Sequence, residues 1–302
     1  MKACQGWIAR LGGCFVGALM AGSGFAADGL SARSPAPGLD GGAHVKGQTT
    51  LASHYARIQS ALVSRGLLRQ DRAQNVPMTA AALEESFYEI ALQHEYGRSS
   101  AGKPLLRWED PVRYAVAFGA SITDSQRRAD TSAIGQYFRR LSGVTGHPIA
   151  AGTSPNFLVL VVNDGERRGM GAYLRSNVPG ISNASINAIL RMPTNHFCMV
   201  VTVPHANRAN GIQSAVAVIR AEHSGRMRTS CIHEELAQGM GLPNDCRNAR
   251  PSIFNDDEEF GVLTAHDEHL LRILYSPSLR SGMRREDARP IVQSLTQQLA
   301  LR

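Results

Sequence analysis

Residues 228–245 read RTSCIHEELAQGMGLPND, and the pattern of their apolar and polar side chains decides the fold class. The apolar positions recur four residues apart and are Ile232, Leu236 and Met240. This period predicts an amphipathic helix with one side against a hydrophobic core. Thr229 or Ser230 can cap the helix at its start, and Gly241 is placed to end it.

The opposite side of this helix is polar. Glu234 and Gln238 stand one turn apart, Glu235 sits beside them, and Asn244 and Asp245 follow after a proline. In most proteins such a face is simply solvated. The alternative is a set of ligands or catalytic groups that lines a groove.

This layout resembles that of zinc peptidases of the zincin class. In these enzymes two histidines four residues apart bind the metal, the glutamate between them activates water, and a glycine turn leads to a third ligand. With Glu234 taken as the first position, residues 234–245 are similar to the long metzincin motif at Glu235, Gly241 and Asp245. The resemblance implies that Glu235 is the catalytic glutamate and that Gly241 and Asp245 support the site.

The sequence departs from the zincin pattern at the metal-ligand positions. Glu234, Gln238 and Asn244 stand where the histidines belong, and His233 is one residue out of register. Carboxylate and amide oxygens suit calcium, magnesium or manganese better than zinc. We therefore expect no bound zinc at these degenerate positions, which leaves weak calcium or magnesium binding as the remaining option.

Two later segments resemble further parts of the same enzymes. Residues 250–255 (RPSIFN) resemble the methionine turn of metzincins, with Phe254 at the methionine. Thr264 and residues 267–275 resemble the helix that follows this turn. We expect the polar side of the motif helix to line a groove floored by the Phe254 turn.

The chain also resembles a bacterial family. Residues 231–245, 251–260 and 270–283 are similar to the uncharacterised proteobacterial family catalogued as domain of unknown function 2927. The resemblance runs from about residue 50 to the end of the chain. It implies an exported protein with a zincin-like fold, and it carries no established activity.

The remaining periodicities predict an α+β protein. Helical spacing over 51–68 and 80–96 indicates a helical subdomain at 50–110. Strands and helices then follow one another, which predicts a zincin-like mixed sheet with helices packed on it over 111–302, including a C-terminal helix. The expected strands are 112–118, 157–162, 197–203 and 215–219, and the expected helices between them lie near 123–141, 167–175 and 184–190.

The first 26 residues predict a secretory signal peptide. Lys2 and Arg10 precede an apolar stretch at 11–21, and small residues stand at the processing site before Ala27. Residues 27–49 are rich in Gly, Pro, Ser and Ala, which is typical of a flexible tether. We expect a periplasmic or secreted protein.

Export would place the mature chain where disulfides form. Cys4 and Cys14 would leave with the signal peptide, so that Cys198, Cys231 and Cys246 remain. Cys198 lies in a strand-like run and Cys231 near the start of a helix, positions that packed layers bring together. We favour a Cys198–Cys231 disulfide with Cys246 reduced, and a Cys231–Cys246 bridge stays open as the alternative.

Composition excludes several classes of protein. With 43% hydrophobic and 19% charged residues the chain can bury a core, which excludes a disordered protein. Without Lys2 and Arg10 the chain has 30 basic against 25 acidic residues and no long basic run, so that nucleic-acid binding is not expected. The apolar stretches are too short for a transmembrane helix.

Other constellations are weaker. Gly119-Ala120-Ser121 follows a strand as in a nucleophile elbow, but the second glycine is absent. Cys246 as a thiol nucleophile competes with a buried packing role. Residues 255–259 (NDDEE) form an acidic cluster without the glycine of a calcium loop, so a solvated loop is the favoured interpretation.

Together these patterns predict an exported, zincin-like pseudo-metallopeptidase with a binding or structural role in the cell envelope. Its partner would be an envelope protein or peptide that the sequence does not identify. The alternative is a peptidase-like hydrolase that uses Glu235 as general base with non-standard ligands.

Overall fold

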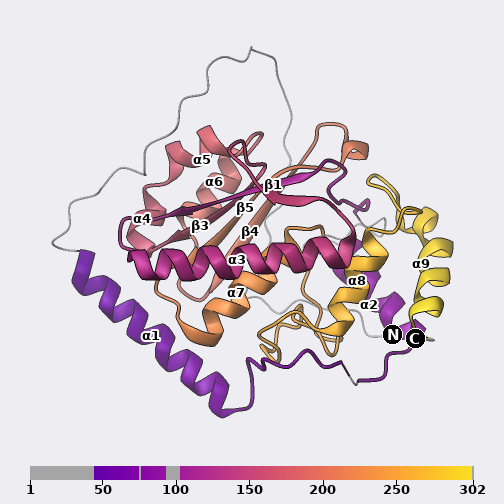
Figure 1. Cartoon of the computed structure of the whole chain (residues 1–302), viewed down its shortest axis with the longest axis horizontal. Helices are drawn as coiled ribbons and strands as arrows, with labels where there is room; N and C mark the ends of the chain where they lie inside the picture. Colours follow the sequence, from indigo (N-terminus) through magenta and orange to yellow (C-terminus); the bar gives the residue numbers. More distant parts are fainter. Residues whose placement is uncertain (1–43, 75, 93–102, 301–302) are drawn as a thin grey trace.

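The computed structural model describes residues 44–74, 76–92 and 103–300. The predicted signal peptide (1–26) lies outside the described residues, as does most of the predicted tether (27–49). The described part contains a mixed sheet with helices packed on it (Figure 1), which confirms the predicted α+β class. Within this part no helix has the length and apolar character needed to span a bilayer.

The sheet has five strands in the order β2-β1-β3-β5-β4. The strands are β1 Val112–Phe118, β2 Ile149–Ala151, β3 Phe157–Val162, β4 Cys198–Pro204 and β5 Ile212–Arg220. The first four in spatial order run parallel, and β4 pairs antiparallel with β5 at the edge. The predictions for β1 and β3 are confirmed to the residue, whereas the short edge strand β2 was not expected.

Helices connect and cover the strands. They are α1 His44–Ser64, α2 Ala80–Leu92, α3 Asp124–Thr145, α4 Asp164–Arg168, α5 Gly171–Asn177, α6 Asn183–Leu190, α7 Gly225–Gln238, α8 Ala265–Leu274 and α9 Arg285–Ala300. The bounds of α3 follow from its caps, since the Thr123 side chain accepts from the Gln126 N–H at 3.3 Å and Gly146 closes the helix at φ 68°.

Both faces of the sheet are buried, because successive side chains of a strand point to opposite faces. Val159 and Val161 of β3 pack in one hydrophobic core with the residues of α2, α3, α7 and α8. Leu158 and Leu160 pack in a second core with residues of α5 and α6. The continuous apolar run of β3 is explained by this double burial.

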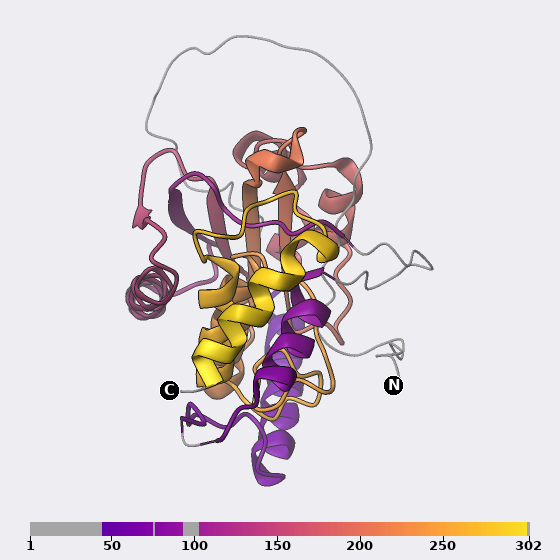
Figure 2. The ribbon, with the colours of Figure 1, turned by 90° about the vertical axis from the view of Figure 1, so that its right-hand side faces the viewer.

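Helix α2 belongs to the larger of these two cores. Its side chains Leu83, Phe87 and Ile90 are at most 1% exposed and share the core with strand and α7 residues. Figure 2 shows α2 beside α9, and the two helices are in contact along with α8. Helix α2 is thus joined to the sheet by a common core.

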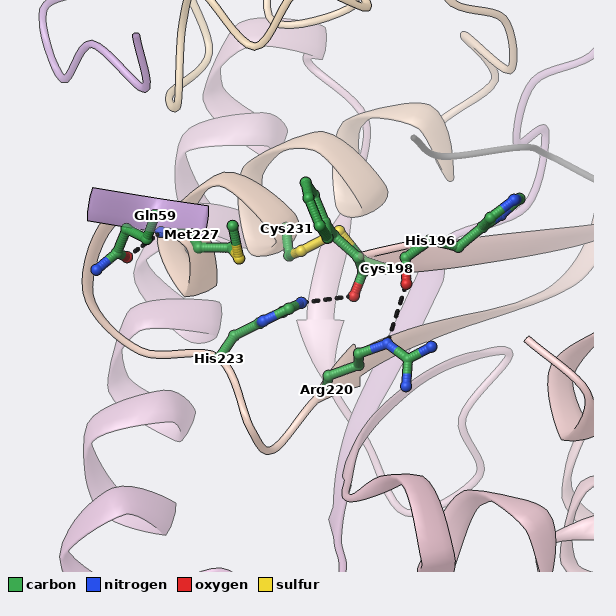
Figure 3. Close-up of a disulfide and its surroundings, with 8 residues drawn as sticks. Gln59, His196, Cys198, Arg220, His223, Met227 and Cys231 are labelled. Carbon is green, nitrogen blue, oxygen red and sulfur yellow. Dashed lines mark hydrogen bonds between the residues drawn. A yellow bond between two sulfur atoms is a disulfide. The ribbon is translucent and has the colours of Figure 1, made fainter. Parts of the chain in front are cut away.

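Helix α7 begins earlier than the sequence predicts. Ser224 is its N-cap residue and Gly225 its first residue, so the prediction of a cap at Thr229 or Ser230 is wrong. The physical reason lies in tertiary structure: the Gln59 side chain of α1 reaches across and accepts a hydrogen bond from the Met227 N–H at 2.9 Å (Figure 3).

The disulfide favoured by the sequence is present. Cys198, the first residue of β4, is bonded to Cys231 in the middle of α7, and the Cα atoms lie 5.7 Å apart (Figure 3). Cys246 is a buried free cysteine whose thiol donates to the Glu89 carboxylate at 2.9 Å. The covalent link fixes α7 to the edge strand of the sheet.

We predict that replacement of both Cys198 and Cys231 by alanine lowers the free energy of unfolding by roughly 3 to 4 kcal/mol, because the bridge restricts a long loop of the unfolded chain. Urea denaturation of both proteins measures the difference. Cys246→Ser, which keeps a donor for Glu89, should cost much less. An equal loss in both variants would show that the disulfide contributes no more than ordinary core packing.

Candidate functional site

Helix α7 buries two of its polar side chains as well as its apolar stripe. The stripe residues Ile232, Leu236 and Met240 are 5%, 0% and 0% exposed, and Glu235 and Gln238 are each 1% exposed. Glu235 and Gln238 therefore do not form the solvated face that was the alternative to a groove. A buried polar group is stable only with a partner, either within the fold or supplied by a ligand.

Glu234 and Glu235 meet the disulfide where α7 crosses the start of β4. One oxygen of each carboxyl group and the Sγ atom of Cys198 all lie within 4.8 Å of one another. A cavity of about 10 Å³ lies at this point, close to the smallest space that holds one water molecule. It is lined by Phe197, Cys198, Met227, Ser230, Cys231, Glu234 and Glu258.

Glu258 comes from the loop that follows the Phe254 turn. Its backbone carbonyl accepts a hydrogen bond of 2.8 Å from the Leu68 N–H, and the carbonyl of Glu259 accepts one of 3.0 Å from the Arg69 N–H. Glu258 itself adopts a positive φ of 59°, which is uncommon for a residue with a side chain. The chain segment after α1 thus holds this loop, so that the Glu258 side chain lines the same cavity as Glu234.

The other acidic side chains of the loop are paired with arginines. The ion pairs are Arg247–Asp256, Arg250–Asp257, Arg250–Glu259 and Arg69–Glu259. Within the described residues no hydrogen bond or ion pair reaches the carboxyl oxygens of Glu234, Glu235 or Glu258, and both oxygens of Glu235 are fully buried. We call these three side chains the carboxyl cluster.

The electrostatics of the carboxyl cluster follow from burial and like charge. Burial, followed by the charges of Asp245 and Glu258, raises the pKa of Glu234 well above its usual value. Burial, Glu234 and Glu258 do the same to the pKa of Glu235. Burial and Asp256 raise the pKa of Glu258 to about 7. The fully ionised cluster is therefore costly unless a cation compensates it.

The remaining residues of the predicted metal set have partners elsewhere. The Gln238 amide donates to the Asp245 carboxylate at 2.8 Å, and the Asn244 amide donates to the Ile90 carbonyl of α2 at 2.9 Å. Asp245, which was expected to support the site, therefore accepts a hydrogen bond from Gln238. Since amides turned to these acceptors replace the imidazoles that zinc requires, the residues at positions 234, 238 and 244 do not fit a zinc ion.

His233 has a structural role in the core. Its Nδ1 accepts a hydrogen bond from the Leu263 N–H at 3.1 Å, and its ring stacks on Tyr137 with centroids 4.0 Å apart. Burial, aided by the Arg140 charge, lowers the pKa of His233 to about 3. The imidazole is thus neutral and its Nδ1 is occupied by a backbone donor.

The Phe254 turn is organised by a carboxylate of α8. Asp267 accepts hydrogen bonds from the Ser252 hydroxyl at 2.5 Å, from the Ile253 N–H at 3.0 Å and from Thr264. Phe254 is 0% exposed and belongs to the larger core. Of the residues expected to line a groove above this turn, Glu234 lines the small cavity, whose walls include the disulfide and not Phe254.

Comparison with known proteins identifies the family of the chain. Residues 80–294 match the model of the family described as "Protein of unknown function (DUF2927)". The chain belongs to this family. No curated protein and no solved structure matches. The match covers the sheet, the carboxyl cluster and most of α9, so that the site described above lies within the family region.

Sequence reasoning missed the role of Glu258. The acidic run 255–259 was interpreted as a solvated loop, and most of its charges are indeed paired at the surface. The sequence signal that could have indicated this is that residues 256–259 are four acids, whereas only Arg247 and Arg250 lie nearby in the sequence. Only the fold shows that, within the described residues, the acid of this run without an arginine partner is Glu258 and that it lines the same cavity as Glu234.

We predict that Gly241→Ala destabilises the protein by about 2 to 4 kcal/mol, because Gly241 has φ 116° and an added Cβ would lie 2.3 Å from the Leu106 carbonyl oxygen. The matched control is Gly143→Ala in α3, where the added Cβ meets nothing within 4 Å and a gain of roughly 0.5 to 1 kcal/mol is expected. Urea denaturation measures both. Equal stability of the two variants would contradict the assigned backbone.

We predict that His233 makes the fold sensitive to acid. The unfolded chain binds a proton at this residue below about pH 6.5, whereas the folded chain binds it only near its pKa of about 3. Stability should therefore fall as the pH drops through this window, by about 1 kcal/mol per pH unit. His233→Gln keeps an acceptor for the Leu263 N–H, and its unfolding free energy should fall less between pH 6.5 and pH 5 than that of the wild type. Parallel pH profiles would refute a neutral His233.

Proposed function

We propose that this DUF2927 protein is exported and has a binding or structural role in the cell envelope, without peptidase activity, on a zincin-like scaffold. The observation that carries the proposal is the position of Glu235. Its side chain is 1% exposed, and the adjoining cavity of about 10 Å³ is far below the 300 Å³ or more that small-molecule sites usually offer. A general base needs direct access to water and substrate.

The contacts around Glu235 support the same conclusion. Gln238 and Asn244, which stand at the remaining ligand positions of the zincin pattern, hold the chain after α7 and the C-terminal part of α2. They stabilise the turn that Gly241 makes possible. The residues at the zincin ligand positions thus make structural contacts here, as expected of a scaffold that has lost metal-dependent catalysis.

The zincin-like scaffold is supported by the chain order of the described elements. A mixed sheet ends in β5, α7 follows directly with Glu235 near its last turn, and the Phe254 turn and α8 come next. Export is supported by the Cys198–Cys231 disulfide, since such bonds persist mainly in oxidising compartments such as the periplasm.

The alternative, a hydrolase built on Glu235, is favoured by one observation. Burial raises the pKa of Glu235 well above its usual value, and shifted carboxyl groups are common among catalytic acids and bases. Structural carboxyl groups show such shifts as well. The two functions differ in whether the carboxyl group of residue 235 is required.

The experiment is the replacement Glu235→Gln, with Glu259→Gln as the matched control of equal charge change. We expect no cleavage of a peptide library by the wild type or by either variant. We also expect Glu235→Gln to restore the phenotype of a deletion strain and to unfold at a melting temperature equal to or above that of the wild type, because a buried unpaired carboxyl group is removed.

The hydrolase would be established by a specific pattern of results. Cleavage by the wild type and by Glu259→Gln, with none by a Glu235→Gln protein of unchanged melting temperature, would show that Glu235 is a catalytic base. Failure of Glu235→Gln to complement, with unchanged stability, would also count against a purely structural role.

A further inference from the structure

Three arginine side chains from separate parts of the chain converge on one buried carboxylate. The carboxylate belongs to Glu268 of α8, whose side chain is 8% exposed. Its Oε1 accepts from Arg72 at 2.5 Å and from Arg140 at 3.0 Å, and its Oε2 accepts from Arg272 at 3.2 Å. Arg72 lies between α1 and α2, and Arg140 lies on α3. We call the three basic side chains the arginine cluster.

Contacts within the fold hold the members of the cluster in place. The Arg72 carbonyl accepts a hydrogen bond of 2.9 Å from the N–H of Ala265, the first residue of α8. The Arg140 guanidinium donates to the Leu263 carbonyl at 2.8 Å, and α3 is in contact with α8. Because the guanidinium groups are already assembled, a ligand that binds them has little ordering entropy to overcome.

The arginine cluster carries more positive charge than its ion pairs compensate. Three guanidinium groups share the single carboxylate of Glu268, which leaves two positive charges. Of the acids next to the cluster in sequence, Asp267 accepts hydrogen bonds from the Phe254 turn, and Asp71 is paired with Arg69. Within the described residues no other acidic side chain forms an ion pair with the three arginines.

The cluster also has donors to spare and is open to solvent. The buried Nε of Arg72 has no acceptor among the described residues, which is a costly arrangement for a buried donor. The side chains of Arg72, Arg140 and Arg272 are 39%, 24% and 41% exposed. An anion can therefore reach the guanidinium groups without a rearrangement of the fold.

His269 adjoins the cluster on the same helix. Its Nδ1 lies 3.4 Å from Nη1 of Arg272. Burial, followed by the charges of Arg272 and His266, lowers the pKa of His269, although the charge of Glu268 opposes the change. The imidazole is therefore mainly neutral at pH 7 and leaves the charge of the cluster unchanged. Its titration reports on the potential at the cluster.

The donors and the charge define the class of ligand. A guanidinium group is a planar fork that matches an oxyanion through paired N–H···O bonds, and phosphate groups are commonly bound in this way. A phosphate monoester carries about −1.5 to −2 charges at pH 7, which balances the two uncompensated charges of the cluster. A carboxylate, with one charge, balances half of them.

We propose that Arg72, Arg140 and Arg272 form a surface site for a phosphate monoester group beside Glu268, where α3, α8 and the segment after α1 meet. The group belongs either to a soluble molecule or to a lipid headgroup, and both sources offer the same chemistry. The site goes beyond the proposed function and does not depend on it, because none of its residues contributes to the environment of Glu235.

The test uses the full chain with its disulfide intact in a phosphate-free buffer. Sodium phosphate is titrated by calorimetry, and the melting temperature is compared with that in sodium chloride of the same ionic strength. We expect one equivalent of phosphate to bind with a Kd of about 1 mM or lower and to raise the melting temperature more than chloride does. We also expect the pKa of His269, followed by NMR, to rise, because a nearby anion favours the imidazolium.

The variants are Arg272→Gln, Arg272→Lys and, as matched control, Arg139→Gln. Arg139 is exposed and adjoins Arg140 on α3, and it forms no ion pair within the described part of the chain. Arg272→Gln should weaken phosphate binding by about fivefold or more, and Arg272→Lys by less, since it keeps the charge and loses the fork. Arg139→Gln should leave the affinity within about twofold. Arg272→Gln should fold, because Glu268 keeps Arg72 and Arg140.

Vesicles distinguish the two sources of the phosphate group. The protein is sedimented with phosphatidylcholine vesicles that contain or lack phosphatidic acid, whose headgroup is a phosphate monoester. Binding that requires phosphatidic acid and is lost in Arg272→Gln assigns the site to a lipid headgroup. Binding of free phosphate without binding to these vesicles assigns it to a soluble ligand. Both results support the site.

Three results would overturn the proposal. The first is the absence of binding heat, and of a melting shift beyond that of sodium chloride, up to about 10 mM phosphate. The second is equal weakening by Arg272→Gln and Arg139→Gln, which would attribute binding to net charge alone. The third is an unchanged pKa of His269 at saturating phosphate, which would place the anion elsewhere. The cleavage and complementation tests of Glu235→Gln are separate measurements, so failure of this site and failure of the proposed function are distinguishable.

Discussion

The structure depends on the packing of helix α7 between the sheet and helices from distant parts of the chain. Its apolar stripe packs in the larger core against the sheet, and its Cys231 is bonded to the edge strand β4. The first turn is held by Gln59 of α1 and by the buried ion pair of Arg228 with Asp130 of α3, at 2.5 Å. Helices that are far apart in the chain therefore contact one another through α7, which keeps a partly exposed face at Arg226, Thr229 and His233.

Because so much of α7 and its surroundings is buried, the pairing of buried charges is decisive for stability. Most buried charges of the described part are paired: Arg220 is 0% exposed and contacts Asp164 at 3.1 Å. Although burial opposes the change, hydrogen bonds from Arg167 and Arg168 lower the pKa of Asp164 to about 2. The carboxyl cluster shows the opposite behaviour, with raised pKa values and, among the residues that the structure describes, no ion pair with an arginine. Within the described part of the chain, Asp164 thus has charged partners, whereas neither oxygen of the Glu235 carboxyl group has a hydrogen-bond donor.

In the loop at 255–261, one acidic side chain differs from its neighbours in its surroundings. The neighbouring acidic side chains are paired with arginines at the surface. Glu258 instead adopts a positive φ, and its side chain lines the cavity beside Glu234. Backbone bonds from Leu68 and Arg69 maintain that geometry. Leu68 and Arg69 lie almost two hundred positions earlier in the sequence, so no local sequence pattern could have shown this loop geometry.

The sequence by itself determined the class of fold and much of its detail. The alternating and continuous apolar runs located β1 and β3, and the apolar spacing over 123–141 located α3 although the helix runs on to Thr145, because these signals depend on short-range stereochemistry. The pairing of Cys198 with Cys231 was also favoured correctly, since one lay in a strand and the other in a helix that packs on it.

Tertiary structure alone decided where the polar residues of the motif went. The sequence could place Glu234, Glu235 and Gln238 on one side of a helix, but it could not show that Glu235 and Gln238 are buried, because burial depends on which other segments pack there. The start of α7 was misjudged for the same reason, since its capping group comes from Gln59. Contacts between residues distant in the chain thus determined the site, whereas periodicity and caps determined the elements that carry it.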